Sequence, residues 1–293
     1  MPADPTRAQG EFARPLGPMA AALWSAAFLF AYALMVEVVS WVRPGSDRDG
    51  ATLALLYTAG ALLVLLAIAR VHAPEASLRV LLGVRPVRFV SALLSALMGA
   101  CAALPLGALE DAIAKRAVPV ERAADLARDL ASVDRKTRIA GVLAVLFVAP
   151  IADELIFRGA LVSGVARDRG KEAAILATTL GFAFVSSAGN LSFLPVYLAL
   201  GALLAHARLS TGSVLAAIGA HLALHGVEVA VWFRAHHTID PLVTGDTPKT
   251  PALVLAASAA GAVACALLLW RFGEGEPLPA TGASHSSHGG QDR

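Results

Sequence analysis

Long apolar stretches recur along almost the whole chain, and they limit its fold more than any other feature. A helix that crosses a bilayer needs about 20 mainly apolar residues. Eight segments approach or exceed that length, and the fifth and sixth are the shortest. These segments are residues 18–41, 51–69, 89–109, 139–166, 173–188, 192–205, 213–233 and 252–272. The pattern predicts an all-α, polytopic transmembrane helical bundle of about eight spans.

The composition excludes several other classes of protein. Of the 293 residues, 57% are hydrophobic and 16% are charged, and the mean hydropathy is +0.65. Soluble domains carry about 25% charged residues, and a soluble fold would lack the polar surface to cover so apolar a chain. The net charge of +2 is too small to indicate a nucleic-acid partner. We therefore expect a multi-pass membrane protein with a lipid bilayer as its surroundings.

The chain divides into a membrane domain and two tails. Residues 18–272 form the predicted transmembrane domain, and residues 1–17 and 273–293 are predicted to be disordered tails. The first apolar segment is longer than a signal-peptide core of about 7–15 residues, so we interpret it as a retained helix. Residues 120–133 alternate apolar and charged positions at helical spacing. They form either an amphipathic helix at the membrane interface or a solvated connector.

Ionisable residues inside the fourth segment are the first candidates for chemistry, because charge within a bilayer is costly. Asp153 and Glu154 fall near the middle of this segment, and Arg158 follows Glu154 by four residues. That order favours a helical ion pair between Glu154 and Arg158, which leaves Asp153 as a second acid. Pro150 removes a helical hydrogen bond just before the acids and favours a kinked, water-accessible segment. The alternative is a purely structural ion pair with Asp153 at its edge.

The seventh segment supplies candidate partners for these acids. His221 and His225 lie one turn apart on one helical face, and Glu228 follows three residues later. Two imidazoles at this spacing can hold a metal ion or a water molecule between them. In the alternative interpretation, Glu228 caps His225, and His221 forms a hydrogen bond within the bundle. The two segments together suit a site that activates water or the proton relay of a transporter.

Three motifs on successive segments resemble those of a known family. The chain contains Asp153-Glu154-x-x-x-Arg158, then Phe182-Ala183-Phe184-Val185-Ser186, then His221-x-x-x-His225. This order resembles the CPBP intramembrane proteases, the group of CAAX prenyl protease 2, Abi and lysostaphin-resistance-like proteins. Their pattern is EExxxR, FxxxH and HxxxN or similar. The resemblance covers residues 139–233.

The resemblance implies a role for each matching residue. Asp153 would be the general base, Glu154 its hydrogen-bonded or metal-facing neighbour, and Arg158 the residue that orients Glu154. His221 and His225 would donate hydrogen bonds to the oxyanion. A zinc or other divalent ion held by Glu154, His221 and His225 is one alternative, and a site without a metal is the other.

The chain departs from the family pattern at three positions. Asp153 replaces the first glutamate and is shorter by one methylene group, and His225 stands in the asparagine position. Ser186 stands where the family has histidine. A serine can donate a hydrogen bond but cannot act as a base near neutral pH.

The resemblance therefore implies an intramembrane endopeptidase that hydrolyses a hydrophobic or lipidated protein substrate with a carboxylate-activated water. The first alternative, suggested by Ser186, is a catalytically impaired member that acts as a membrane scaffold or immunity protein. The second is a proton-coupled transporter with Asp153, Glu154 and His221 as relay. Common transporters have two related halves, and the sequence contains no internal repeat.

Overall fold

The computed structural model describes residues 16–46, 49–117, 134–236 and 250–273, and this part of the chain folds into helices without any strand. The α-helices are α1 (Pro18–Val42), α2 (Gly50–His72), α3 (Leu78–Leu81), α4 (Phe89–Ala117), α6 (Arg135–Leu143), α7 (Ala149–Asp153), α8 (Val162–Arg169), α9 (Lys171–Ser186), α10 (Leu194–Thr211), α11 (Val214–His236) and α12 (Ala252–Phe272). Two π-helical segments, η2 (Ala144–Val148) and η3 (Glu154–Leu161), and a short 3-10 segment, η4 (Leu191–Phe193), lie between them.

Seven helical stretches of the described residues are long and apolar enough to cross a membrane. They are Pro18–Val42, Gly50–His72, Phe89–Ala117, Arg135–Arg169, Leu191–Thr211, Val214–Val231 and Ala252–Phe272. The remaining predicted span is α9, which has 16 residues. At 1.5 Å per residue α9 is about 24 Å long, shorter than a hydrocarbon core of about 30 Å. The predicted all-α polytopic bundle is confirmed, and the protein is an integral multi-pass membrane protein.

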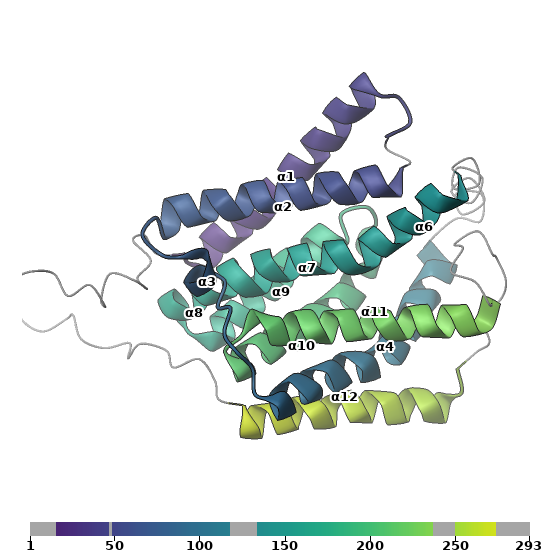
Figure 1. The fold of residues 1–293 in the computed structure, drawn as a ribbon. Coiled ribbons are helices and arrows are strands. Elements are labelled where there is room, and N and C mark those ends of the chain that lie inside the picture. The colour runs from purple at the N-terminus through teal and green to yellow at the C-terminus, as the bar shows by residue number, and fades with distance from the viewer. Residues whose placement is uncertain (1–15, 47–48, 118–133, 237–249, 274–293) are drawn as a thin grey trace, which may run out of the picture.

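The fourth span lies inside the bundle. Figure 1 shows α1 and α2 on one side of the molecule and α12 on the opposite side. Between them, the continuous span from α6 to α8 contacts α2 through α6, η2 and α7, and it contacts α11 through η2, α7 and η3. Helix α4 packs along both α11 and α12. The segment that carries the paired acids is thus enclosed by the second span and by the helix that carries the histidines.

Two π-helical segments interrupt the fourth span around the acids. Pro150 lies in the first turn of α7, directly after the π-helical segment η2. Its missing N–H explains an irregular hydrogen-bond pattern at this point. The second π-helical segment begins at Glu154, and every residue of η3 except Leu155 is buried. Since π-helical turns are frequent at functional sites, the predicted interruption coincides with the candidate site.

Helices α4 and α11 approach each other closely at Gly99. A Cβ atom built on Gly99 would lie 1.9 Å from the carbonyl oxygen of Ala220, the residue before His221. Only a residue without a side chain allows this approach. A Cβ atom on Gly107 of the same helix would meet nothing within 4 Å. The contact at Gly99 therefore determines how deeply the helix of His221 enters the bundle.

Some sequence predictions fall on residues that the structure does not describe. They are the interface helix or connector of residues 120–133 and, apart from residues 16–17 and 273, the two tails. These stay predictions.

Candidate active site

Glu154 is completely buried at the start of η3 and joins two of the predicted partners. Its Oε1 atom lies 3.2 Å from Nη1 of Arg158 and accepts a hydrogen bond of 2.9 Å from Nδ1 of His221. The ion pair expected from the sequence spacing is therefore present, and it includes a histidine from α11. The second oxygen, Oε2, is buried and accepts no hydrogen bond from the described residues. Because such an atom is costly to leave unsatisfied, Oε2 is a candidate position for binding water or a substrate N–H group.

Arg158 is held by three different helices of the bundle. Besides its pair with Glu154, its Nη2 atom donates a hydrogen bond of 3.1 Å to the carbonyl oxygen of Gly201 on α10. Its guanidinium lies over the ring of Phe182 on α9, 4.2 Å from the ring centre. A buried arginine held in this way keeps its charge and its position. These contacts hold Arg158 beside Glu154, and its role in orienting that carboxylate stays a prediction of the resemblance.

Asp153 takes a different partner from its neighbour. It is 8% exposed, and its Oδ1 atom accepts a hydrogen bond from the hydroxyl of Tyr57 on α2. The ring of Tyr57 packs edge-on against Phe28, with ring centres 4.9 Å apart, and against Tyr32 at 5.2 Å. The two acids thus point to opposite neighbours, Asp153 to α2 and Glu154 to α11.

Sequence reasoning missed Tyr57, although the sequence contains a signal for it. The chain has only three tyrosines, and Tyr57 falls within the second apolar span. A tyrosine hydroxyl inside a helical bundle needs a hydrogen-bond partner. A tyrosine in that position therefore indicates a polar group on a neighbouring helix, but it does not say which one.

The two histidines of α11 lie side by side as the spacing predicts. Their rings are stacked with centres 5.0 Å apart and planes inclined by 27°. Phe182 packs edge-on against His221, with ring centres 6.2 Å apart. Nδ1 of His225 forms a hydrogen bond of 2.6 Å with Oε2 of Glu228, so the predicted cap is also present. Because each Nδ1 donates to a carboxylate, each Nε2 carries a lone pair when its ring is neutral and donates a proton when its ring is charged.

The second motif reaches the site through Phe182 and not through its serine. Phe182 contacts both Arg158 and His221. Ser186, one turn later on α9, is partly buried, and no hydrogen bond joins it to the described site residues. Ser187 is buried and donates a hydrogen bond of 2.6 Å to the carbonyl oxygen of Ala183. The role of Ser186 stays a prediction.

The arrangement of Glu154, His221 and His225 does not fit a metal centre. In the described part of the chain, no group of three or more His, Cys, Asp or Glu side chains is arranged to hold an ion. The lone pairs of imidazole lie in the ring plane, so nearly parallel stacked rings do not direct them to one point. Both Nδ1 atoms are already bonded to carboxylates. The stacked arrangement therefore does not suit the predicted ligation of zinc or another divalent ion.

A cavity of about 500 Å³ lies beside Glu228 and has several ionisable residues in its lining. It lies between α4, α11 and α12, and its ionisable lining residues are Glu110, Asp111, Lys115 and Glu228. Glu228 is the residue that binds His225, and the ring of His225 stacks on His221. Glu228 therefore connects the lining of this cavity to the stacked histidines.

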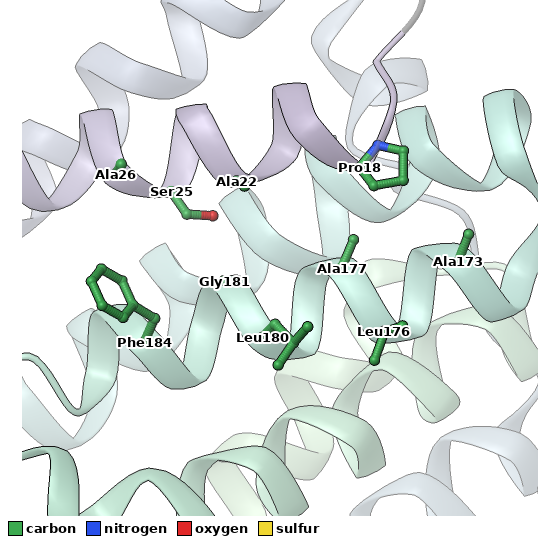
Figure 2. A pocket seen from close by; sticks show the side chains of 10 residues that line it. All are labelled: Pro18, Ala22, Ser25, Ala26, Ala173, Leu176, Ala177, Leu180, Gly181 and Phe184. Carbon is green, nitrogen blue, oxygen red and sulfur yellow. The ribbon is translucent and has the colours of Figure 1, made fainter.

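A second cavity, between α1 and α9, has a different character. Figure 2 shows its lining, which is made mainly of small and apolar side chains and includes Ala22, Ala177 and Leu180. Its volume is about 450 Å³, and none of its lining residues is ionisable. This cavity has no group that can activate water, so it is not the catalytic candidate.

The site brings together the groups that peptide hydrolysis requires. Asp153 is a carboxylate near the bundle interior that can accept a proton. The cluster of Glu154, Arg158 and His221 holds a fixed positive charge and a histidine that can stabilise negative charge on a reacting carbonyl. These groups come from the fourth and seventh spans, as predicted, and the second motif contributes the aromatic ring of Phe182.

Comparison with known proteins identifies the segment that carries this site. Residues 135–227 match the family model of the type II CAAX prenyl endopeptidase Rce1-like proteins. Searches among curated proteins and among solved structures found no match. The matched segment contains Asp153, Glu154, Arg158, His221 and His225. The match confirms the resemblance to the CPBP intramembrane proteases over residues 135–227, where the chain is similar to the Rce1-like proteins of this group.

Proposed function

We propose that the protein is an intramembrane endopeptidase that hydrolyses a peptide bond of a hydrophobic or lipidated protein substrate. The observation that carries the proposal is the buried cluster of Glu154, Arg158 and His221, next to Asp153, within the segment that matches the prenyl endopeptidase family. The family match at residues 135–227 supports a membrane protease. We further propose the substrate class and the roles of the individual residues.

In the proposed reaction, Asp153 is the general base. It removes a proton from a water molecule while the water oxygen attacks the carbonyl carbon of the scissile bond. The carbonyl oxygen becomes an oxyanion, and the C–N bond then breaks as the departing amine takes the proton from Asp153. Neither step consumes the protein, and the products are a new carboxylate and a new amine.

The proposed oxyanion donors are His221 and His225. Nδ1 of His221 is bonded to Glu154, so only Nε2 is available to the substrate. To donate from Nε2 the ring must carry a second proton. The Glu154 carboxylate is the counter-charge that such a ring would face, and Arg158 lies within ion-pair distance of the same carboxylate. This gives the ion pair a function beyond structure.

The proposed substrate is a protein end that partitions into the bilayer. The site lies within membrane-spanning helices, so a substrate segment must reach it from the lipid or from the polar cavity beside Glu228. The family description names prenyl endopeptidases, and we extend that class to this chain as prenylated or otherwise hydrophobic peptides. A bacterial cytoplasmic membrane is the proposed location, and separation of inner from outer membranes of expressing cells tests it.

A second candidate is a catalytically impaired family member that acts as a scaffold or immunity protein. The observation that favours it is Ser186, which stands in the position of a histidine and forms no hydrogen bond to the described site residues. Loss of one acid–base participant typically lowers a rate by about 10²–10⁴-fold. On this alternative, binding of a membrane partner would survive substitution of Asp153.

The test is cleavage of prenylated and unmodified hydrophobic peptides by the purified protein in liposomes, followed by mass spectrometry. We expect defined cleavage by the wild type and none by Glu154→Ala or His221→Ala. Glu172→Ala, which removes an exposed carboxylate from α9, is the matched control and should cleave normally. Cleavage that survives both site substitutions would reject the site assignment, and an inactive wild type would favour the impaired alternative.

A further inference from the structure

We infer that Tyr57 is a positioning residue for Asp153, and that it compensates for the short acid at this position. The inference rests on the proposed function, because it assigns Tyr57 a part in that reaction. Tyr57 lies on α2, outside the matched segment of residues 135–227. The family match therefore provides no role for it.

The contact itself is specific. The Tyr57 hydroxyl donates a hydrogen bond to Oδ1 of Asp153 across two helices, 96 residues apart in the sequence. Asp153 is almost completely buried, so water does not compete strongly for Oδ1. With Oδ1 occupied, Oδ2 is the oxygen that remains available to accept a proton from water. The hydrogen bond thus decides which carboxylate oxygen can act as the base.

The donor is held rigidly in place. The ring of Tyr57 packs edge-on against Phe28 at 4.9 Å and against Tyr32 at 5.2 Å. Phe28 in turn lies 6.4 Å from Phe157 of η3, also edge-on. This row of rings connects α1 and α2 to the π-helical segment that begins at Glu154. A side chain fixed in this way keeps its hydroxyl at one point, which pre-organises the acid that it contacts.

The chemistry of the acid explains why a fixed donor would be needed. Asp153 is one methylene group shorter than the glutamate of the family pattern, so its carboxylate lies closer to its own backbone. Without a donor, the side chain could turn between rotamers at the end of α7, where the π-helical segment η3 begins. A hydrogen bond from Tyr57 selects one rotamer. We therefore expect the benefit of Tyr57 to depend on the residue at position 153.

The first test compares two Tyr→Phe substitutions on neighbouring rings. Tyr57→Phe removes the hydroxyl that contacts Asp153 and keeps the ring, whereas Tyr32→Phe removes the hydroxyl of the neighbouring ring that packs edge-on against Tyr57. A hydrogen bond to a charged group contributes about 1.5–3 kcal/mol, so Tyr57→Phe should lower kcat about 10–100-fold. KM should stay within about twofold, since the loss is confined to the chemical step. Tyr32→Phe should leave kcat unchanged.

A second test separates positioning from a structural role. In the Asp153→Glu background the acid is longer, and Tyr57→Phe should lower kcat by a smaller factor than it does in the wild type. An equal factor in both backgrounds, or an unchanged kcat for Tyr57→Phe, would overturn the inference. Equal loss in Tyr57→Phe and Tyr32→Phe would also overturn it, because the two substitutions share only their effect on packing.

A spectroscopic measurement keeps the inference testable if the protein does not cleave the peptides. The infrared band of the Asp153 carboxyl group is identified as the band lost in Asp153→Asn. It should shift in Tyr57→Phe and stay in place in Tyr32→Phe. If the wild type is inactive and the band shifts in Tyr57→Phe, the proposed function is rejected but the contact between Tyr57 and Asp153 stands. If the band does not shift in Tyr57→Phe, the contact itself is rejected. If Tyr57→Phe does not fold, 3-fluorotyrosine at position 57 changes the donor strength and should shift the same band.

Discussion

Nδ1 of His221 lies 2.9 Å from Oε1 of Glu154, although 67 residues separate them in the sequence. The same oxygen faces Arg158 at 3.2 Å, and the side chains of Glu154 and Arg158 are both completely buried. One oxygen atom thus connects the ion pair within the fourth span to the histidine helix.

Removing one partner of the buried Glu154–Arg158 ion pair should lower the stability of the protein more than replacing both partners. Glu154→Gln leaves the Arg158 guanidinium buried without its counter-charge, and such a loss costs about 3–5 kcal/mol. The double variant Glu154→Gln, Arg158→Met removes both charges, so it should unfold at a higher temperature than Glu154→Gln alone. Thermal unfolding in detergent by intrinsic fluorescence measures the difference. A double variant that is less stable than the single one would contradict this account of the pair.

The close contact at Gly99 should control the position of His221. Gly99→Ala places a Cβ atom against the carbonyl oxygen of Ala220, so α11 must move away from α4. We expect a loss of thermal stability, by analogy with overpacked cores that lose about 1–3 kcal/mol, together with a loss of cleavage. Gly107→Ala is the matched control, because nothing lies within 4 Å of its added Cβ. Equal behaviour of the two variants would show that the contact does not position the histidine.

The hydrogen bond between His225 and Glu228 should orient the second histidine. Glu228→Gln replaces the charged acceptor of Nδ1 with a weaker, neutral amide oxygen, so the His225 ring is held less firmly and kcat should fall. In the His225→Asn background, which restores the residue of the family pattern, Glu228→Gln should have no further effect. Steady-state kinetics of the four proteins measure this coupling. An effect of Glu228→Gln that is the same in both backgrounds would mean that Glu228 acts on something other than His225.

The stacked imidazoles lead to an expectation about metal dependence. Because their lone pairs do not converge and both Nδ1 atoms are bonded to carboxylates, we expect cleavage to survive treatment with a strong chelator. Elemental analysis of the purified protein should accompany the assay. Activity that is lost on chelation and restored by added zinc would show that these side chains rearrange around an ion.

The sequence predicted side-chain contacts correctly where both residues of the contact lie on one helix. Residues four apart on a helix lie on one face, so the Glu154–Arg158 pair and the His221–His225 stack follow from spacing alone. The apolar segments predicted the spans because a bilayer demands helices of a minimum length. Contacts between spans could not be predicted in the same way, since a single sequence does not specify which helix faces which. Tyr57 was missed for this reason, and the π-helical turns depend on the packing around them.

In the second motif, the sequence pointed to a different residue from the one that contacts the site. Its resemblance to the family directed attention to Ser186, the position of the replaced histidine. In the structure it is Phe182 that contacts both Arg158 and His221. An aromatic residue in an apolar span carries no signal of its own that separates core packing from a place beside a buried cation.

Hydrolysis in water enriched in oxygen-18 tests the central claim most directly. If Asp153 activates a water molecule for attack on a peptide bond, mass spectrometry should find one heavy oxygen atom in the new carboxyl terminus of a cleaved prenylated peptide. Asp153→Asn should form this product at least about 10²-fold more slowly, as expected for removal of a general base. Labelled product formed at the same rate by wild type and Asp153→Asn, or no product from the wild type, would contradict the claim.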